Sequence, residues 1–451
     1  MDFIVDIFDY ISNLGSMVMI PIMIMVVGLL FRLNILKAIR AGIMVGIGFV
    51  GLNLVLTIIW DYVGPVTNIL IERFDLNLSV VDAGWAAAAG VAFATKVGAV
   101  IIPFIILINF LMLLFRQTKT VNIDIWNYWH YAFTGAVIMT VTDNFWYGLY
   151  GAAAHAIIAL KIADIAAPRV QQVIGIPGIS IPQGFAVTTI PIYLLLDKLY
   201  DKIPFMNKRK IDTDAVQKKL GVLGEPLMIG FILGILLGLA VGYDVKKVLE
   251  LGISMAALML LLPRMVKVIM EGLVPISDAA KSFLEKRFKG SEFYIGLDSA
   301  VTLGHATTIT VAILLIPITL VLAMILPLNT TLPFGDLAAT AFFIAMATPI
   351  HRGDILRTLI SGTIVMAIIL LIASYFAPII TESAVNTGFA FPENATKITA
   401  LSAGNLIALI LSLLAKIKIV GAILILAIVA GVLAIFRSKK STKSTGSSME
   451  V

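Results

Sequence analysis

Two ionisable side chains lie in an otherwise apolar stretch, residues 292–305, in which Asp298 precedes His305 by seven positions. About twenty mostly apolar residues follow, enough to enter a bilayer. A carboxylate and an imidazole at membrane depth are strongly unfavourable unless they are paired or face a cavity. Gly296 and Gly304 allow the backbone to turn, and irregular backbone at that depth must line a cavity or be buried in protein. We therefore expect a re-entrant hairpin whose tip presents Asp298 and His305 to a polar substrate. Asp298 could also accept a hydroxyl proton.

Other polar side chains in apolar surroundings extend this candidate site, and each has a purely structural alternative. Gln183 could bind hydroxyl groups through its amide or merely satisfy a broken helix. His130, in an aromatic segment with Asn127 and Trp129, could bind substrate or belong to an interfacial belt. Trp85 could stack on a sugar skeleton. The candidate substrate-binding residues are Asp298, His305, Gln183, Ser180, His130, Asp82, Trp85 and Glu225, the last with a helix-dipole role as its alternative.

The composition excludes a soluble protein. The 451 residues are 60% hydrophobic and 13% charged, with a mean hydropathy of +1.02, which is typical of a polytopic membrane protein. The net charge of +6 comes from cations in short loops and does not indicate nucleic-acid binding. Cysteine is absent, which excludes disulfides, thiolate metal sites and cysteine nucleophiles within this chain. No soluble-enzyme motif is present, and we expect no metal or cofactor.

Apolar runs separated by short basic loops predict an all-α fold with about eleven membrane spans. The loop after the first span contains Arg32, Lys37 and Arg40, so the positive-inside rule places it in the cytoplasm, with the N-terminus outside and the C-terminus inside. Two threadings remain open for residues 120–205. Either two spans precede a re-entrant loop, or the glycine- and proline-rich segment 174–184 is half of a broken span.

The second half of the chain predicts three further features. Spans are expected near residues 249–262 and 338–350. Residues 264–289 are amphipathic and basic, so we expect a cytoplasmic surface helix or loop there. The tail, residues 437–451, is expected to be cytoplasmic and disordered.

A weak internal repeat organises these elements. Two spans, a hairpin and three spans occur in each half, and Val81-Asp82 in the first hairpin aligns with Leu297-Asp298 in the second. Five spans per repeat is an odd number, so the second copy should be inverted and the two hairpins should enter from opposite faces. This arrangement is typical of a carrier with alternating access.

Seven segments carry a family resemblance. They are similar to the galactitol-type membrane component, enzyme IIC, of the bacterial phosphoenolpyruvate-dependent sugar phosphotransferase system, and they follow its order along nearly the whole chain. The segments are DLNLSVVDAGW at 75–85, NIDIWN at 122–127, GEP at 224–226, IGLD at 295–298, GH at 304–305, PFGDLA at 333–338 and HRG at 351–353. One departure concerns the substrate, because Gln183 stands where the family pattern has histidine.

The resemblance implies a permease in the bacterial cytoplasmic membrane that binds and carries a sugar alcohol. A separate IIB protein then phosphorylates the sugar from a phosphocysteine, and a IIA protein recharges IIB. The chain would be a membrane subunit of a phosphotransferase complex without a phosphorylatable residue of its own, which agrees with its lack of cysteine. Basic cytoplasmic segments would suit the docking of IIB.

The related ascorbate carriers imply a homodimer whose mobile core shifts as a rigid body against a scaffold. That division predicts one IIC domain over 1–451, with scaffold spans at about 1–65 and 220–265 and a core at about 66–205 and 290–382. A last span at 415–436 and the tail complete the chain. The alternative function is an ion-coupled secondary transporter of a neutral sugar or polyol, which would share the repeat and the hairpins.

Overall fold

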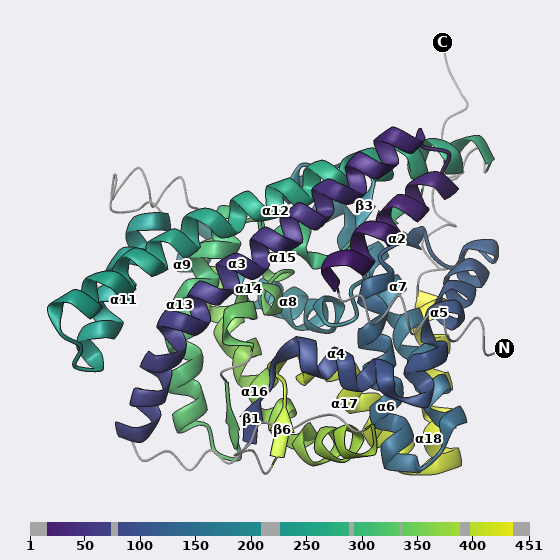
Figure 1. Cartoon of the computed structure of the whole chain (residues 1–451). Coiled ribbons are helices and arrows are strands. Elements are labelled where there is room, and N and C mark those ends of the chain that lie inside the picture. The colour runs from purple at the N-terminus through teal and green to yellow at the C-terminus, as the bar shows by residue number, and fades with distance from the viewer. Residues whose placement is uncertain are drawn as a thin grey trace.

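Helices form most of the computed structural model, and short strands join them (Figure 1). The structure describes residues 16–73, 80–208, 226–287, 293–333, 336–387 and 397–435. The N-terminal segment and the C-terminal tail therefore lie outside the described residues, as does Glu225.

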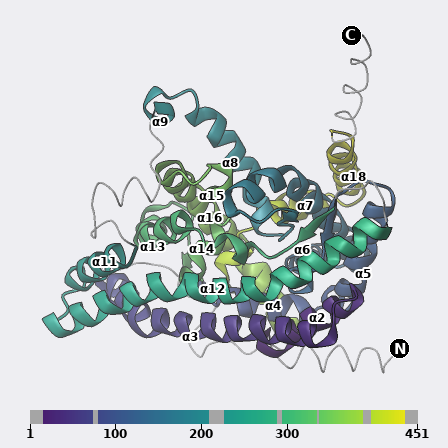
Figure 2. The same ribbon diagram turned by 90° about the horizontal axis from the view of Figure 1, so that it is seen from above.

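Each half begins with a helical hairpin. The first consists of α2 (Ser16–Leu30) and α3 (Ile35–Arg73), and the second of α11 (Pro226–Ala240) and α12 (Val245–Arg287). The helices α3 and α12 lie side by side along one edge of the molecule (Figure 2). Small residues allow this close approach, since a methyl group at Gly272 would lie 2.6 Å from the carbonyl oxygen of Ala41.

Both long helices exceed the predicted spans. With 39 and 43 residues they extend about 58 and 64 Å, roughly twice the hydrocarbon thickness of a bilayer. The span expected at 249–262 and the separate surface segment expected at 264–289 are one continuous helix, α12. Pro263, which lies between the two segments, does not end the helix.

The remaining elements of the first half follow the α2–α3 hairpin in the chain. In order they are β1 (Val80–Asp82), α4 (Gly84–Ala94), α5 (Lys96–Leu114), β2 (Thr120–Asn122), the 3-10 helix η1 (Ile125–Tyr128), α6 (Trp129–Thr142), α7 (Phe145–Ile174), β3 (Ile179–Ser180), α8 (Ala186–Tyr200) and α9 (Pro204–Lys208). The helices α6 and α7 precede the glycine- and proline-rich segment, which is the order that the first threading requires.

The second half repeats this order. Its elements are β4 (Tyr294–Gly296), η3 (Ser299–Thr302), α13 (Ala306–Ile325), β5 (Thr331–Leu332), η4 (Leu337–Ala339), α14 (Thr340–Phe343), α15 (Ala347–Ile350), α16 (Ile355–Asn386), β6 (Lys397–Thr399), η5 (Leu401–Ala403), α17 (Leu406–Ala415) and α18 (Lys418–Ile435). The span expected at 338–350 is not one helix but the three short pieces η4, α14 and α15.

Two small parallel sheets interlock the halves, and the all-α prediction missed them. Strand β1 of the first half lies between β5 and β6 of the second, while β4 of the second half lies between β2 and β3 of the first. The strands have only two or three residues, too few for an alternating pattern to be read from the sequence. Their pairing satisfies backbone groups where the helices are interrupted.

Two buried aspartates complete the sheet around β1. The carboxylate of Asp82 accepts hydrogen bonds from the backbone N–H groups of Gly84, Leu401 and Asp336. The carboxylate of Asp336 accepts from the N–H groups of Trp85 and Ser402. Together these two side chains hold three loops that are far apart in the sequence.

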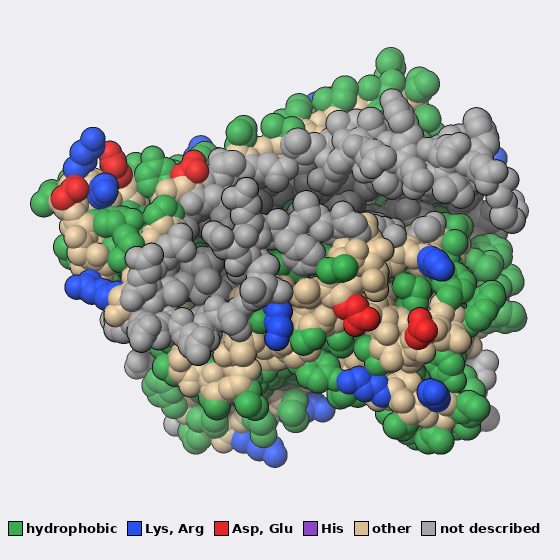
Figure 3. Space-filling view, turned by 60° about the horizontal axis from the view of Figure 1, so that its bottom comes forward, with side chains coloured by type: hydrophobic (Ala, Val, Ile, Leu, Met, Phe, Trp, Pro, Cys, Tyr) green, Lys and Arg blue, Asp and Glu red, His purple; other side chains and the backbone are tan. Residues whose placement is uncertain are grey.

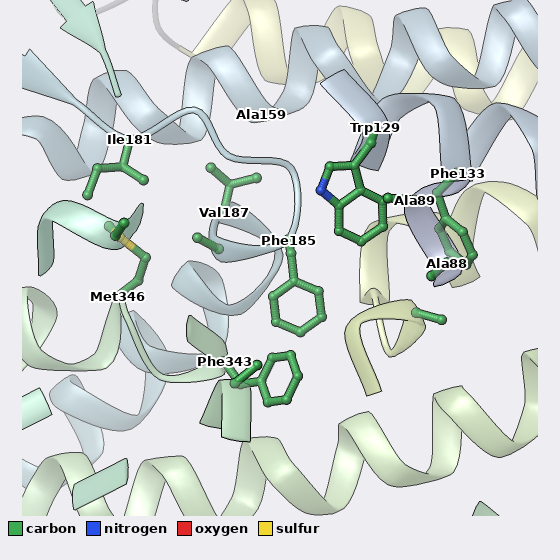
Figure 4. Packing of buried hydrophobic residues seen from close by; sticks show 14 of the residues in the cluster. Ala88, Ala89, Trp129, Phe133, Ala159, Ile181, Phe185, Val187, Phe343 and Met346 are labelled. Carbon is green, nitrogen blue, oxygen red and sulfur yellow. The ribbon is translucent and has the colours of Figure 1, made fainter. Parts of the chain in front are cut away.

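Apolar packing fills the centre of the molecule. The rings of Phe185 and Phe343, one from each half, lie 5.1 Å apart beside Met346 and Trp129 (Figure 4). Apolar side chains also cover much of the described surface, whereas charged ones gather at the α11–α12 turn, at the left edge of Figure 3. Among the described residues, three helices are long and apolar enough to cross a membrane: α7, α13 and α16.

The aspartate arrangement predicts a large stability effect for Asp336→Ala. Two buried N–H groups would lose their acceptor, so the free energy of unfolding should fall by about 2–5 kcal/mol. Equilibrium unfolding in detergent micelles measures this loss. The control is Glu382→Ala, which removes an exposed carboxylate on α16 and should leave the unfolding midpoint unchanged. An equal midpoint for the two variants would contradict the structural role of Asp336.

Candidate functional site

Asp298 lies just after strand β4, at the start of the 3-10 helix η3. Its carboxylate accepts a hydrogen bond from the backbone N–H of Ala300 and thereby caps the helix. The second carboxylate oxygen lies 3.4 Å from Nε2 of Gln183. The side chain of Asp298 is half-buried, so it keeps acceptor capacity that the protein does not use.

Gln183 is held in a fixed orientation between two elements. Its Oε1 atom accepts a hydrogen bond from the backbone N–H of Ala186 at the start of α8, 3.1 Å away. This bond turns the NH₂ group toward Asp298. The predicted pair of an acid and an amide therefore comes from two halves of the chain, 115 residues apart in sequence.

Unsatisfied polar atoms surround this pair. In the described part of the chain, eleven buried side-chain nitrogen and oxygen atoms have no hydrogen-bond partner. Six of the eleven belong to four residues: both amide atoms of Asn122, both amide atoms of Asn127, Nε2 of His130 and Oγ of Ser299. Buried polar groups are normally paired, so such a concentration indicates a ligand that supplies the missing bonds.

Close backbone contacts bring these four residues together. The amide of Asn127 lies beside the carboxylate of Asp298 without meeting the geometry of a hydrogen bond, and Ser299 is the residue after Asp298. A methyl group at Gly296 would lie 2.9 Å from Cα of Asn122. One at Gly184 would lie 2.7 Å from Cβ of His130. Only glycine allows the strands and loops to approach this closely.

The donors and acceptors of this centre suit an uncharged, hydroxyl-rich molecule. Amide groups donate and accept hydrogen bonds, and a carboxylate accepts them. A neutral imidazole donates at one ring nitrogen and accepts at the other. The indole of Trp129 stacks on His130 with ring centroids 3.8 Å apart. Among the described residues, no group of three His, Cys, Asp or Glu side chains could hold a metal ion. We call Asp298, Gln183, Asn122, Asn127, His130 and Ser299 the amide centre.

Three other candidates from the sequence have side chains engaged within the protein. Asp82 ends β1, where three backbone N–H groups saturate its carboxylate, and Trp85 lies in the first turn of α4. The hydroxyl of Ser180 is 2.8 Å from that of Thr120, within the β2–β4–β3 sheet. His305 caps α13 through Nδ1, which accepts from the N–H of Thr307. The structure thus brings Asp298, Gln183 and His130 together, whereas Asp82, Ser180 and His305 have their own partners within the protein.

Sequence reasoning missed two members of the amide centre, Asn122 and Ser299. Asn122 ends a strand of three residues, and Ser299 follows Asp298 in a single 3-10 turn. Neither pattern has a distinctive spacing. The available signal was two asparagines, Asn122 and Asn127, in the aromatic segment that also contains His130.

The structure describes a mostly helical protein with a buried cluster of polar side chains. Comparison with known proteins specifies the class. Residues 10–395 match the family described as "PTS system sugar-specific permease component". The chain is 52% identical over 433 residues to a protein of Escherichia coli K12 named "Putative permease IIC component", covering 96% of this chain and 99% of that protein. It is 42% identical over 403 residues to the galactitol-specific EIIC components of Escherichia coli K12 and O157:H7, covering 89% of this chain and 87% of each relative.

The chain therefore belongs to the family of sugar-specific IIC permeases of the phosphotransferase system. Membership confirms the family resemblance read from the sequence and establishes a membrane permease for sugar transport. It also implies a sugar substrate and partner IIB and IIA proteins.

The amide centre predicts opposite effects for two buried asparagines. Asn127→Leu removes unpaired polar atoms, so the thermal midpoint should stay unchanged or rise, while sugar affinity should fall about tenfold or more. Asn405 is the matched control, because its amide already bonds the carbonyl of Gly184 and the N–H of Ala408. Asn405→Leu should lower the midpoint. Thermal unfolding and equilibrium sugar binding in detergent measure both properties, and loss of stability in Asn127→Leu would contradict the assignment.

Proposed function

We propose that this chain is the IIC permease for a sugar alcohol of the galactitol class, and that the amide centre binds it. The observation that carries the proposal is the set of six unpaired polar atoms next to Asp298 and Gln183. A polyol has a hydroxyl on every carbon and can donate and accept at each one. The relatives named as galactitol-specific support this class. Gln183, in place of the expected histidine, leaves the individual polyol to experiment.

In this mechanism the polyol binds between the hairpins from outside. Asp298, Gln183, Asn127 and His130 bond its hydroxyl groups, and movement of the core against the α3–α12 scaffold exposes a terminal hydroxyl to the cytoplasm. Such movement agrees with two continuous helices packed along one edge of an interlocked core. The exposed apolar face of the scaffold would serve a homodimer or the lipid.

The chemical step moves a phosphoryl group from the partner's phosphocysteine to that hydroxyl. The P–S bond breaks, a P–O bond forms, the sulfur leaves as a thiolate, and the hydroxyl proton passes to the carboxylate of Asp298. The product carries a phosphate dianion, which no longer suits an uncharged site and is released inside. Phosphorylation thus traps the sugar in the cytoplasm.

The deciding experiment is uptake of radiolabelled galactitol into proteoliposomes, with and without phosphorylated IIB inside. We expect label to accumulate only as the phosphate ester and only with IIB. Accumulation of free galactitol along an ion gradient without IIB would instead establish a symporter and refute the proposal.

Asp298→Asn tests the proposed base. Asparagine keeps an acceptor for the N–H of Ala300 but accepts no proton, so phosphorylation should fall at least about 100-fold with a small change in stability. The control, Glu382→Gln, alters an exposed carboxylate and should behave as wild type. Rates are measured with saturating phosphorylated IIB. Full phosphorylation and unchanged binding in Asp298→Asn would remove this residue from the site.

A further inference from the structure

A second polar centre lies at the end of α8, around the buried carboxylate of Asp197. Its Oδ1 atom lies 2.9 Å from Nη1 of Arg357 and 3.2 Å from Nδ1 of His351. Its Oδ2 atom lies 3.5 Å from Arg169 and 3.9 Å from Arg352. Three arginines and a histidine thus share one carboxylate.

The cations on Oδ1 are structural. Arg357 also bonds Asp201 at 2.8 Å and the carbonyl oxygen of Met206 at 3.1 Å, and its side chain is only 9% exposed. Burial lowers the pKa of His351, and the hydrogen bond to Asp197 offsets only part of this effect. Arg357 therefore has little capacity for another ligand, and the unpaired Nε2 atom of His351 is buried away from the surface.

The cations on Oδ2 are loosely held. Arg352 makes only the 3.9 Å approach to Asp197, which is too long for a hydrogen bond, and its side chain is 45% exposed. Arg169 donates at 3.5 Å to Asp197 and at 3.3 Å to the carbonyl oxygen of Ile350, and it is 34% exposed. A guanidinium has five N–H donors in a planar fork. Most of those on Arg352 and Arg169 are unused by the described residues.

One segment of the second half runs from an aromatic contact near Gln183 to the turn that contains Arg352. The segment is formed by residues 337–354. Its Phe343 ring contacts the ring of Phe185, and Phe185 lies two residues after Gln183 in the chain. The segment ends at the turn that contains Arg352 and Gly353. Gly353 lies against His305, since a methyl group added at Gly353 would lie 3.3 Å from Cε1 of that ring. The hydroxyl of Thr307 also donates a hydrogen bond to the carbonyl oxygen of Gly353. His305 in turn is seven residues from Asp298.

We propose that Arg352, supported by Arg169, binds the phosphoryl group of the partner's phosphocysteine while it is transferred to the sugar. This inference rests on the proposed function and adds the residue that receives the second substrate. A planar fork of unused donors is the arrangement that binds phosphate oxygens in a bidentate manner. Asp197 orients the two guanidinium groups without neutralising both. In the transfer, Arg352 would stabilise the equatorial oxygens of the phosphoryl group while the P–S bond breaks and the P–O bond forms.

The test compares Arg352→Gln with a matched control, Arg116→Gln. Both arginines have left-handed backbone conformations, with φ of 55° and 54°, and both follow a helix end. Inside-out vesicles are supplied with galactitol and a titration of phosphorylated IIB. We expect Arg352→Gln to lower kcat/KM for phosphorylated IIB by about 10- to 100-fold, the effect of one or two charge-assisted hydrogen bonds. Arg116→Gln should match wild type.

Three further readouts separate binding of the phosphoryl group from a structural role. The galactitol Kd without IIB and the thermal midpoint should be unchanged in Arg352→Gln. Inorganic phosphate should inhibit wild-type transfer more strongly than it inhibits the variant. Arg352→Lys keeps the charge without the fork and should recover part of the rate.

The outcomes distinguish this inference from the proposed function. If wild-type protein forms no phosphorylated galactitol, the proposed function fails. If wild type does so and Arg352→Gln has the kinetics of Arg116→Gln, only the phosphoryl site is refuted. Parallel weakening of galactitol binding, or a lowered thermal midpoint that Arg352→Lys does not restore, would also overturn it.

Discussion

Backbone hydrogen bonding within a membrane is the constraint on which this fold depends. A chain that interrupts its helices at membrane depth exposes N–H and C=O groups that water cannot satisfy. Here each half lends its hairpin strand to the other half, so that β1 pairs with β5 and β6, and β4 pairs with β2 and β3. The carboxylates of Asp82 and Asp336 satisfy five further N–H groups in the loops around β1. The interlocked halves then form one core.

The two hairpins use equivalent aspartates for different purposes. Asp82 is the last residue of the central strand β1, and Asp298 lies two residues after the central strand β4. The carboxylate of Asp82 accepts three backbone N–H groups and is saturated. Asp298 receives one backbone N–H group and the amide of Gln183, and unpaired polar atoms surround it. Because all the hydrogen bonds of Asp82 are made within the protein, its carboxylate is structural. The carboxylate of Asp298 is incompletely paired, so it is available to a substrate.

The two polar centres divide the proposed reaction between them. The amide centre offers neutral groups and one carboxylate, which suits hydroxyl groups, while Arg352 and Arg169 offer cations, which suit a phosphate. Residues 337–354 connect the two through Phe343 and Gly353. Their break into η4, α14 and α15 lets one segment border both centres, which a regular helix of the same length would not do.

The sequence by itself determined the class, and it predicted a repeat and a set of candidate site residues. Composition and apolar runs identified a membrane protein, because these signals are local, and the alignment of Asp82 with Asp298 pointed to the loops that contain β1 and β4. Asp298, Gln183 and His130 stood out as polar residues in apolar surroundings. The tertiary structure alone decided which of them meet. It revealed strands too short to have a pattern, it gave His305 a role as a helix cap, and it added Asn122 and Ser299. Whether a buried polar atom is satisfied depends on partners from distant parts of the chain, so no local pattern could show that Asp82 is saturated while Asn127 is not.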